Sequence, residues 1–339
     1  MAEPQALPPH AQVIQMGMGG LVSGLVYAAA RLGIADHLAA GPRSAAELAP
    51  SIGSPARSLH RFMRTLANLG LLSQEADEKF SLTPLGAALK SDAPGSARST
   101  ILVMSGGWVW KAWGEIEYSV KTGKTAMEKL FGMGVFDYLA QHPEDAARFS
   151  ETMVGIHGAE PPAIAEAYDF SRFETIVDVG GATGNMLAHI LARYPHAKGI
   201  LFDRPHVVTG APTLLGARGV DNRVKIAHGN FFESVPAGGD AYILSHIIHD
   251  WSESQCLTIL GNCRRAMKPG AKLLIVEFVL PEDSTPHAGK LLDMVMLTIP
   301  GGEERTPTEY KALLSTAGFR MTRVVPSASD ASVVEAELA

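Results

Sequence analysis

The chain has 339 residues, which is more than one typical domain and predicts at least two. Apolar residues make up 46% and charged residues 19%, a composition typical of a well-buried globular protein and not of a disordered one. Binding to nucleic acid or to an anionic membrane usually requires an excess of basic residues. The net charge of −6 shows no such excess, so we expect neither partner.

The two cysteines and the N-terminus indicate a cytoplasmic protein. Cys256 and Cys263 lie in one predicted helix, at a spacing that suits neither a disulfide framework nor a zinc site. The first residues show no basic patch before an apolar core, so we expect no signal peptide. The uncharged stretch 13–30 has enough length to span a membrane. Its four glycines, with Gln15 and Ser23, favour a buried helix or a subunit contact instead.

Residues 1–95 are predicted to form a mostly helical domain with one hairpin. Ser54 is the expected N-cap of a helix with Pro55 at its first position, and Gly70 ends the apolar helical pattern. Two short apolar runs, 71–72 and 80–82, flank a polar turn and predict the hairpin. Two short helices followed by a hairpin suggest a winged helix, which we expect to serve dimerisation.

A winged helix also raises the hypothesis of DNA binding, since Arg57, Arg61 and Arg64 lie on the relevant helix. However, residues 1–95 carry seven Lys/Arg and seven Asp/Glu, whereas a DNA-binding module needs a clear positive excess. A ligand-sensing winged-helix regulator therefore remains only an alternative.

Residues 96–170 are predicted to form a helical linker that contributes to a substrate pocket. Large side chains cluster here, among them Trp108, and a second helix from about residue 142 carries Phe149 and Met153 at helical spacing. Each of these residues alone fits an interdomain core. As a group they could also form the wall of a pocket for a flat apolar ligand, because aromatic and methionine side chains adapt to such surfaces.

Residues 171–339 alternate short apolar runs with helical segments, which predicts a Rossmann-like, doubly wound α/β sheet. The expected strands cover residues 175–179, 199–202, 224–227, 241–244 and 272–276, with a helix at 187–194 after the first.

A glycine turn after the first strand predicts a nucleoside-containing cofactor. The segment 178–185 reads Asp-Val-Gly-Gly-Ala-Thr-Gly-Asn, and Asp203 ends the next strand, where an acid can accept hydrogen bonds from a ribose. The glycine spacing matches neither a dinucleotide fingerprint nor a phosphate loop. The pattern indicates an S-adenosylmethionine enzyme, although a purely structural turn in an α/β protein would also explain it.

His249 follows the fourth strand, at the sheet edge where ligands bind in open α/β folds. Ser252 and Gln255 predict a capping box that fixes the start of the next helix. Methyl transfer to a hydroxyl needs a base, and a histidine within hydrogen-bond reach suits a phenol. Glu277 and Glu304 are candidates to orient this histidine and stabilise its charged form.

His246 is interpreted as a structural residue. A metal site on His246 and His249 lacks further ligands at sensible spacing, so no metal is expected.

Three segments together resemble the plant and bacterial small-molecule O-methyltransferases, the caffeate-type and antibiotic-tailoring enzymes. They are Asp178–Gly184, His249–Ser252 and Pro300–Thr306, and the resemblance extends over nearly the whole chain. It implies a metal-independent, homodimeric enzyme that transfers methyl from S-adenosylmethionine to a hydroxyl of a small aromatic molecule, leaving S-adenosylhomocysteine.

The resemblance also implies residue roles. His249 is the base, flanked by Glu277 and Glu304. The implied cofactor contacts are Asp178, Gly180, Gly181, Asp203, Asn230, Phe231 and Ser245, and the implied substrate contacts are Trp108, Met153, His157 and Met294. Three positions depart from the family pattern: Ala182 replaces a glycine, Asn230 an aspartate, and Ser245 a lysine common in plant members. A cofactor-binding relative with a different reaction, such as N-methylation, hydroxylation or decarboxylation, is the main alternative.

Overall fold

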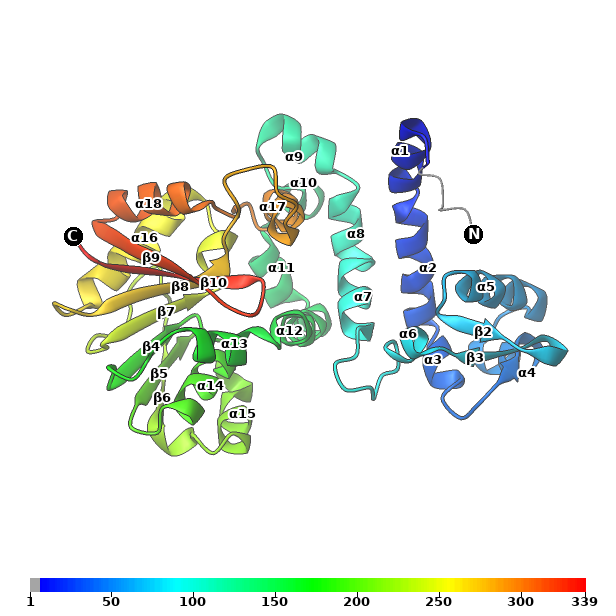
Figure 1. The fold of residues 1–339 in the computed structure, drawn as a ribbon, viewed down its shortest axis with the longest axis horizontal. Helices are drawn as coiled ribbons and strands as arrows, with labels where there is room; N and C mark the ends of the chain where they lie inside the picture. The colour runs from blue at the N-terminus through cyan, green and yellow to red at the C-terminus, as the bar shows by residue number, and fades with distance from the viewer. Residues whose placement is uncertain (1–6) are drawn as a thin grey trace, which may run out of the picture. The chain divides into compact units, whose positions relative to one another are not determined.

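The computed structural model describes residues 7–339, which form two compact units. The smaller unit contains the described part of residues 1–111 together with 139–156, and the larger contains 112–138 and 157–339. Figure 1 traces the elements of both in chain order. The predicted 96–170 segment is not a unit of its own in this division, because its residues are shared between the two.

A seven-stranded sheet forms the centre of the larger unit, in the order β6-β5-β4-β7-β8-β10-β9 (Figure 1). The first five strands in this order run parallel, whereas β10 is antiparallel to both β8 and β9. The strands are β4 (Thr175–Val179), β5 (Lys198–Asp203), β6 (Val224–His228), β7 (Ala241–Ser245), β8 (Lys272–Phe278), β9 (Phe319–Pro326) and β10 (Ala331–Leu338). The predicted doubly wound α/β fold is confirmed.

Helices precede β4 and connect most of these strands along the chain. They are α9 (Ile116–Thr122), α10 (Ala126–Phe131), α13 (Glu160–Ala167), α14 (Asn185–Arg193), α15 (Ala211–Ala217), α16 (Glu253–Ala266), α17 (Ala288–Thr298) and α18 (Pro307–Thr316), with 3-10 turns η2 (Val208–Gly210), η3 (Asp221–Arg223) and η4 (Ile248–Asp250). The strand order reverses at β4, with β5 and β6 on one side and β7 and β8 on the other. Ligands in such sheets bind beyond the carboxyl ends of the strands at this switch point.

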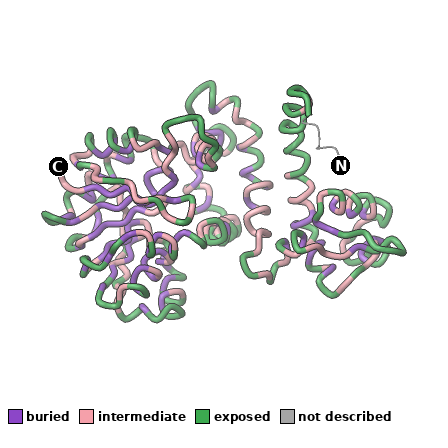
Figure 2. The backbone as a smooth tube through the Cα atoms, in the orientation of Figure 1, coloured by how far each residue is buried: buried purple, intermediate pink, exposed green. Residues whose placement is uncertain are grey.

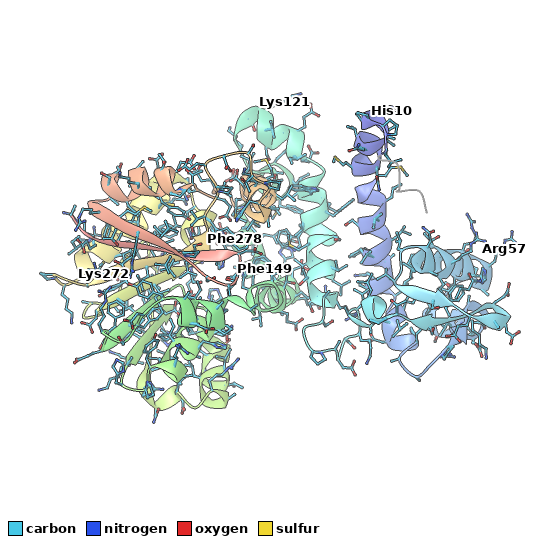
Figure 3. All side chains as sticks on the ribbon, in the orientation of Figure 1. His10, Arg57, Lys121, Phe149, Lys272 and Phe278 are labelled. Carbon is cyan, nitrogen blue, oxygen red and sulfur yellow. The ribbon has the colours of Figure 1, made fainter. Side chains whose placement is uncertain are left out.

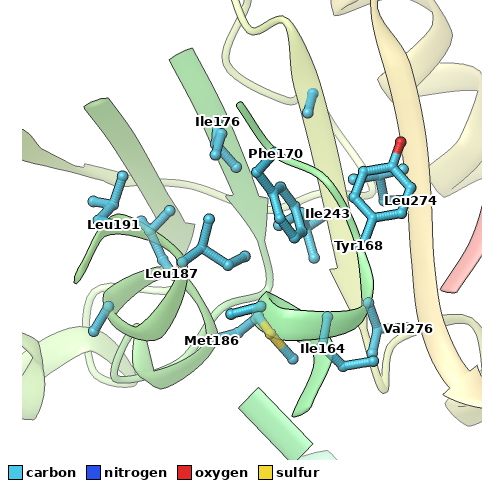
Figure 4. Packing of buried hydrophobic residues seen from close by; sticks show 14 of the residues in the cluster. Ile164, Tyr168, Phe170, Ile176, Met186, Leu187, Leu191, Ile243, Leu274 and Val276 are labelled. Atoms are coloured by element: carbon cyan, nitrogen blue, oxygen red, sulfur yellow. The ribbon is translucent and has the colours of Figure 1, made fainter. Parts of the chain in front are cut away.

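Alternate residues of each central strand enter two different cores. Ile176 of β4 belongs to the core shown in Figure 4, together with Leu187 of α14 and Ile243 of β7. The next residue of β4, Val177, belongs to the other core, with Ile259 of α16. Figure 2 shows the resulting continuous burial of the central strands. This alternation follows from the two-residue period of a strand and fixes the register of the sheet.

The smaller unit has its own core, built around Leu48, Met63 and Phe80. Its elements are α1 (Pro9–Gly17), α2 (Gly19–Arg31), α3 (Ile34–His37), β1 (Arg43–Ser44), α4 (Ala45–Ile52), α5 (Ala56–Asn68), β2 (Leu72–Gln74), η1 (Ala76–Glu78), β3 (Lys79–Leu82), α6 (Pro84–Ala87) and α7 (Arg98–Met104). The helices α8 (Gly107–Trp113), α11 (Val135–Gln141) and α12 (Pro143–His157) each include residues of both units. The predicted hairpin is β2 paired antiparallel with β3.

One prediction about the smaller unit is wrong, and one of two alternatives for its N-terminal stretch is excluded. Ser54 does not cap α5, because Pro55 is extended (ψ 130°) and is itself the N-cap residue, and the Ser54 hydroxyl makes no hydrogen bond within residues 7–339. The apolar stretch 13–30 is not a helix buried within this chain, because Val13, Met16 and Leu21 are 67%, 77% and 63% exposed. The alternative, a subunit contact, stays a prediction. The helical stretch Pro9–Arg31 is long and apolar enough to cross a membrane, judged by length and composition only. In the structure, 11% of its most apolar 18-residue segment is buried.

Candidate active site

The site lies at the carboxyl ends of the parallel strands of the larger unit. Three chain segments supply it: the glycine turn between β4 and α14, the end of β5, and the loop from β7 to α16 that contains η4. Gln255 accepts a hydrogen bond from the backbone N–H of Ser252 at 3.2 Å, which fixes the start of α16 directly after this loop. Ordered elements on both sides therefore hold the loop that carries His249.

His249 and Glu304 form a buried pair. Their side chains meet at 2.6 Å between Nδ1 and Oε1, and the residues are 5% and 4% exposed. Asp250 is the nearest other acid, with Oδ1 3.6 Å from the second ring nitrogen, Nε2. Burial on its own would lower the pKa of His249, but the charges of Asp250, Glu304 and Glu277 outweigh it and raise that pKa to about 10.

Glu277 hydrogen-bonds to the backbone of the same loop and influences the imidazole only through its charge. Its Oε1 accepts the backbone N–H groups of Ile247, Ile248 and His249 at 3.1, 2.6 and 3.1 Å. Its Oε2 accepts a hydrogen bond from the Tyr310 hydroxyl. The carboxylate is fully buried at the end of β8. Glu277 is therefore a positioning residue for η4, whereas Glu304 contacts the ring of His249.

The loop that carries Glu304 packs tightly against the loop that carries His249. A Cβ atom at Gly302 would lie 1.9 Å from the carbonyl oxygen of His249, so only glycine fits there. Asp293 of α17 accepts the backbone N–H of Glu304 at 2.9 Å, and the buried Arg305 donates to the carbonyl of Ile248. Sequence reasoning missed these supports, because residue types far apart in the chain give no sign of contact.

The glycine turn places two acids close together. Asp178 is fully buried, and neither of its oxygens has a hydrogen-bond partner of ordinary geometry in residues 7–339. Burial, followed by repulsion from Asp203, raises the pKa of Asp178 to about 7. A Cβ at Gly181 would lie 2.4 Å from the Asp178 carboxyl carbon, so the backbone of this turn lies directly against the acid.

Asp203 closes the turn from the end of β5. Its two oxygens accept the backbone N–H groups of Ala182 at 3.0 Å and Arg204 at 2.7 Å. Ala182 has a φ of +48°, in the left-handed region that favours glycine. The alanine thus fits where the family resemblance implied a glycine, at the cost of backbone strain.

The other residues expected at the cofactor occupy the same unit. The side-chain oxygen of Asn230 accepts a hydrogen bond from the backbone N–H of Phe232 at 3.0 Å. This acceptor is therefore already used within the turn that contains Asn230. Phe231 packs edge-on against Trp251, with ring centroids 5.9 Å apart. A Cβ at Gly180 would meet the side chains of Ile247 and Phe231. Ser245 is the last residue of β7 and is partly exposed.

The residues expected at the substrate fall into both units. Met294 lies half-buried on α17, and His157 ends α12. His157 and His246 both contact the buried Glu160, which the sequence reading did not single out. Met153 and Trp108 belong to the smaller unit, where Trp108 packs against Phe149 with ring centroids 6.3 Å apart. Phe149 is labelled in Figure 3. A role for Met153 and Trp108 in a pocket stays a prediction.

The fold and these loops define a class I methyltransferase domain preceded by a mostly helical domain. In agreement, the O-methyltransferase domain family matches residues 113–320, and the O-methyltransferase dimerisation domain matches residues 17–92. The chain belongs to the O-methyltransferase family, as its sequence motifs predicted.

Similar proteins cover nearly the whole chain. Phenazine O-methyltransferase of Lysobacter antibioticus is 44% identical, over 98% of this chain and 97% of its own. A Streptomyces davaonensis 8-amino-8-demethylriboflavin N,N-dimethyltransferase is 34% identical over 93% and 91%. The crystal structure of an O-methyltransferase from neocarzinostatin biosynthesis, in complex with S-adenosylmethionine and 2-hydroxy-5-methyl naphthoic acid, is 30% identical and covers 94% and 96%, with a TM-score of 0.84.

Proposed function

We propose that this protein transfers the methyl group of S-adenosylmethionine to a hydroxyl of a small aromatic molecule, with His249 as the general base. The observation that carries the proposal is the buried His249–Glu304 pair at the carboxyl end of β7, beside the glycine turn. S-adenosylmethionine supplies an electrophilic methyl group, so the protein has to supply alignment, a base and a dry site.

The glycine turn fits the expected cofactor. The two unpaired oxygens of Asp178 are acceptors that suit a cationic or N–H-bearing group, and burying them unpaired is costly unless a ligand pairs them. Asp203 keeps lone pairs beyond its two backbone bonds, which suits a ribose diol. Gly180 lets a ligand approach where a Cβ would fill the space beside Ile247 and Phe231.

The His249–Glu304 pair explains how a proton would leave the acceptor. An ionised Glu304 can only accept, so the ring proton of neutral His249 lies on Nδ1 and Nε2 is left as the base. After Nε2 takes the hydroxyl proton, Glu304 and Asp250 stabilise the imidazolium. These negative charges raise the pKa of His249, so the neutral ring that acts as the base becomes populated as the pH rises.

An aromatic hydroxyl is the acceptor that this base suits best, and two similar proteins support the choice. The Lysobacter relative is named for phenazine, and the neocarzinostatin enzyme is bound to a hydroxylated naphthoic acid.

We further propose that the 17–92 domain is a winged helix that makes the protein a homodimer, because α1 and α2 leave a large apolar surface exposed. Dimers of this kind bury apolar helix faces.

The test is to incubate the purified protein with S-adenosylmethionine and a panel of hydroxylated aromatic compounds, and to measure products by mass. We expect a gain of one methyl group on a hydroxyl together with S-adenosylhomocysteine. A protein that binds the cofactor yet methylates none of the panel, while methylating amines, would contradict O-methylation.

N-methylation is the second candidate, because the Streptomyces davaonensis relative is named as an N,N-dimethyltransferase. A neutral amine can attack before it loses a proton, so it needs less help from a base. Replacing His249 by alanine should therefore slow methylation of a hydroxyl far more than methylation of an amine.

A further inference from the structure

Beside the proposed base lies a second cluster that the mechanism above does not use. Each carboxylate oxygen of Glu160 is hydrogen-bonded to one histidine. Oε1 lies 2.9 Å from Nδ1 of His157, and Oε2 lies 2.6 Å from Nε2 of His246. The two imidazole rings are 4.0 Å apart between centroids. All three side chains are largely buried, with 20%, 7% and 13% exposed for His157, Glu160 and His246.

Three separate elements bring these groups together. His157 is the last residue of α12, Glu160 is the first of α13, and His246 follows β7. His246 has a φ of +52°, a conformation that side chains other than glycine rarely adopt. Strained backbone of this kind persists where the surrounding structure enforces it and is often found at functional sites.

The donor set is that of a transition-metal site. One ligand atom from each residue, two imidazole nitrogens and a carboxylate oxygen, lies within 4.8 Å of the others. Zinc takes nitrogen and oxygen ligands at about 2.0–2.2 Å, and two histidines with one glutamate form a three-ligand set that leaves a position open. Small shifts of the side chains would bring all three to bonding distance from one ion.

We propose that His157, Glu160 and His246 form a binding site for a divalent transition-metal ion of the zinc type. The ion replaces the two hydrogen bonds to Glu160 with dative bonds from His157 Nδ1, His246 Nε2 and the carboxylate. Each neutral ring keeps one proton, which moves to its other nitrogen, so binding needs no oxidant or reductant. Harder ions such as Mg²⁺, which prefer oxygen ligands, should bind poorly.

The site is adjacent to the proposed base but separate from it. The rings of His246 and His249 lie 5.1 Å apart between centroids, and His249 is held by Glu304 and not by Glu160. A metal bound by the cluster would leave its open position available to a water or to a polar atom of a ligand. Metal binding is therefore testable without any methyl acceptor.

The experiment is a calorimetric titration of the full chain, freed of metal by chelation, with Zn²⁺ and separately with Mg²⁺. We expect one Zn²⁺ site per chain in the micromolar range or tighter, and no comparable Mg²⁺ site. Glu160→Gln and His246→Asn should each weaken Zn²⁺ binding by roughly tenfold or more. His206→Asn changes an exposed histidine outside the cluster and should leave this site intact, which controls for adventitious binding by other histidines.

Circular dichroism and thermal unfolding check that each variant folds. If the His246→Asn variant does not fold, the nearly isosteric Glu160→Gln variant still tests the site. The proposal is overturned if the wild type binds no Zn²⁺ at one site per chain, or if the Glu160 and His246 variants bind as tightly as the His206 variant. The readout does not involve catalysis. A His249→Ala variant that keeps its methylation rate would contradict the proposed function and leave the metal result unaffected.

Discussion

The Nδ1 atom of His249 lies 2.6 Å from Oε1 of Glu304, although 55 residues separate them in the chain. The contact fixes which ring nitrogen carries the proton and supplies a buried negative charge next to it. Two further features of the fold sustain it: the three backbone N–H groups held by Glu277, and the close packing of Gly302 on the carbonyl of His249.

Glu304→Gln should lower the pKa of His249, because it removes a negative charge that stabilises the imidazolium. The rising limb of kcat/KM against pH, for a hydroxyl acceptor, should move to lower pH, and the maximal rate should fall because the base is weaker. The measurement is a pH–rate profile of wild type and variant. An unchanged apparent pKa in the variant would show that Glu304 does not tune His249.

Glu277→Ala should destabilise the protein and slow methyl transfer together. The variant leaves the buried N–H groups of Ile247, Ile248 and His249 without their acceptor, at a cost of about 1–3 kcal/mol for each unsatisfied group. Denaturant unfolding measures the loss of stability. Glu166→Ala, at an exposed glutamate of α13, is the matched control and should unfold close to wild type. Equal stability of the Glu277 and Glu166 variants would contradict the positioning role.

Much of this fold could be predicted from the sequence, because the strands and the glycine turn are local patterns. The run 175–179 is β4 residue for residue, and the 187–194 helix is α14, shifted by two residues at its start. The site was predicted less completely. Motif and strand position indicate His249, Glu277 and Glu304 as candidates, but the different contacts of the two acids depend on tertiary structure. Glu160, Asp293 and Tyr310 had no motif, and only the folded chain brings them to their partners.

Gly302→Ala should abolish most activity with little effect on cofactor binding. The added Cβ would lie 1.9 Å from the carbonyl oxygen of His249, so the loop carrying Glu304 has to move away from the base. Displacing a catalytic group by about 1 Å can cost about 100-fold in rate. Gly216→Ala, where a Cβ meets nothing within 4 Å, is the control and should keep the wild-type rate. Similar rates for both variants would argue against this packing.

Asp178→Asn should stabilise the protein without cofactor at alkaline pH. The pKa of Asp178 is about 7 in the folded state and lies near 4 in an unfolded chain, so the folded state binds more protons between these values. Stability therefore falls as pH rises from about 4 to about 7, and the asparagine variant avoids that loss. Melting temperatures from pH 4 to 8 measure it. If the variant has a lower melting temperature than wild type at pH 8, the claim that the buried charge of Asp178 destabilises the fold is wrong.

The central claim is that His249 is the base, and the most direct test combines His249→Ala with calorimetry of S-adenosylmethionine binding and a single-turnover methylation assay. Since Asp178, Asp203 and the glycine turn remain intact, cofactor affinity should stay within a few-fold of wild type. The rate of methyl transfer to a hydroxyl should fall by about 10²–10⁴-fold. A variant that binds cofactor normally and keeps most of its rate would show that another group removes the proton.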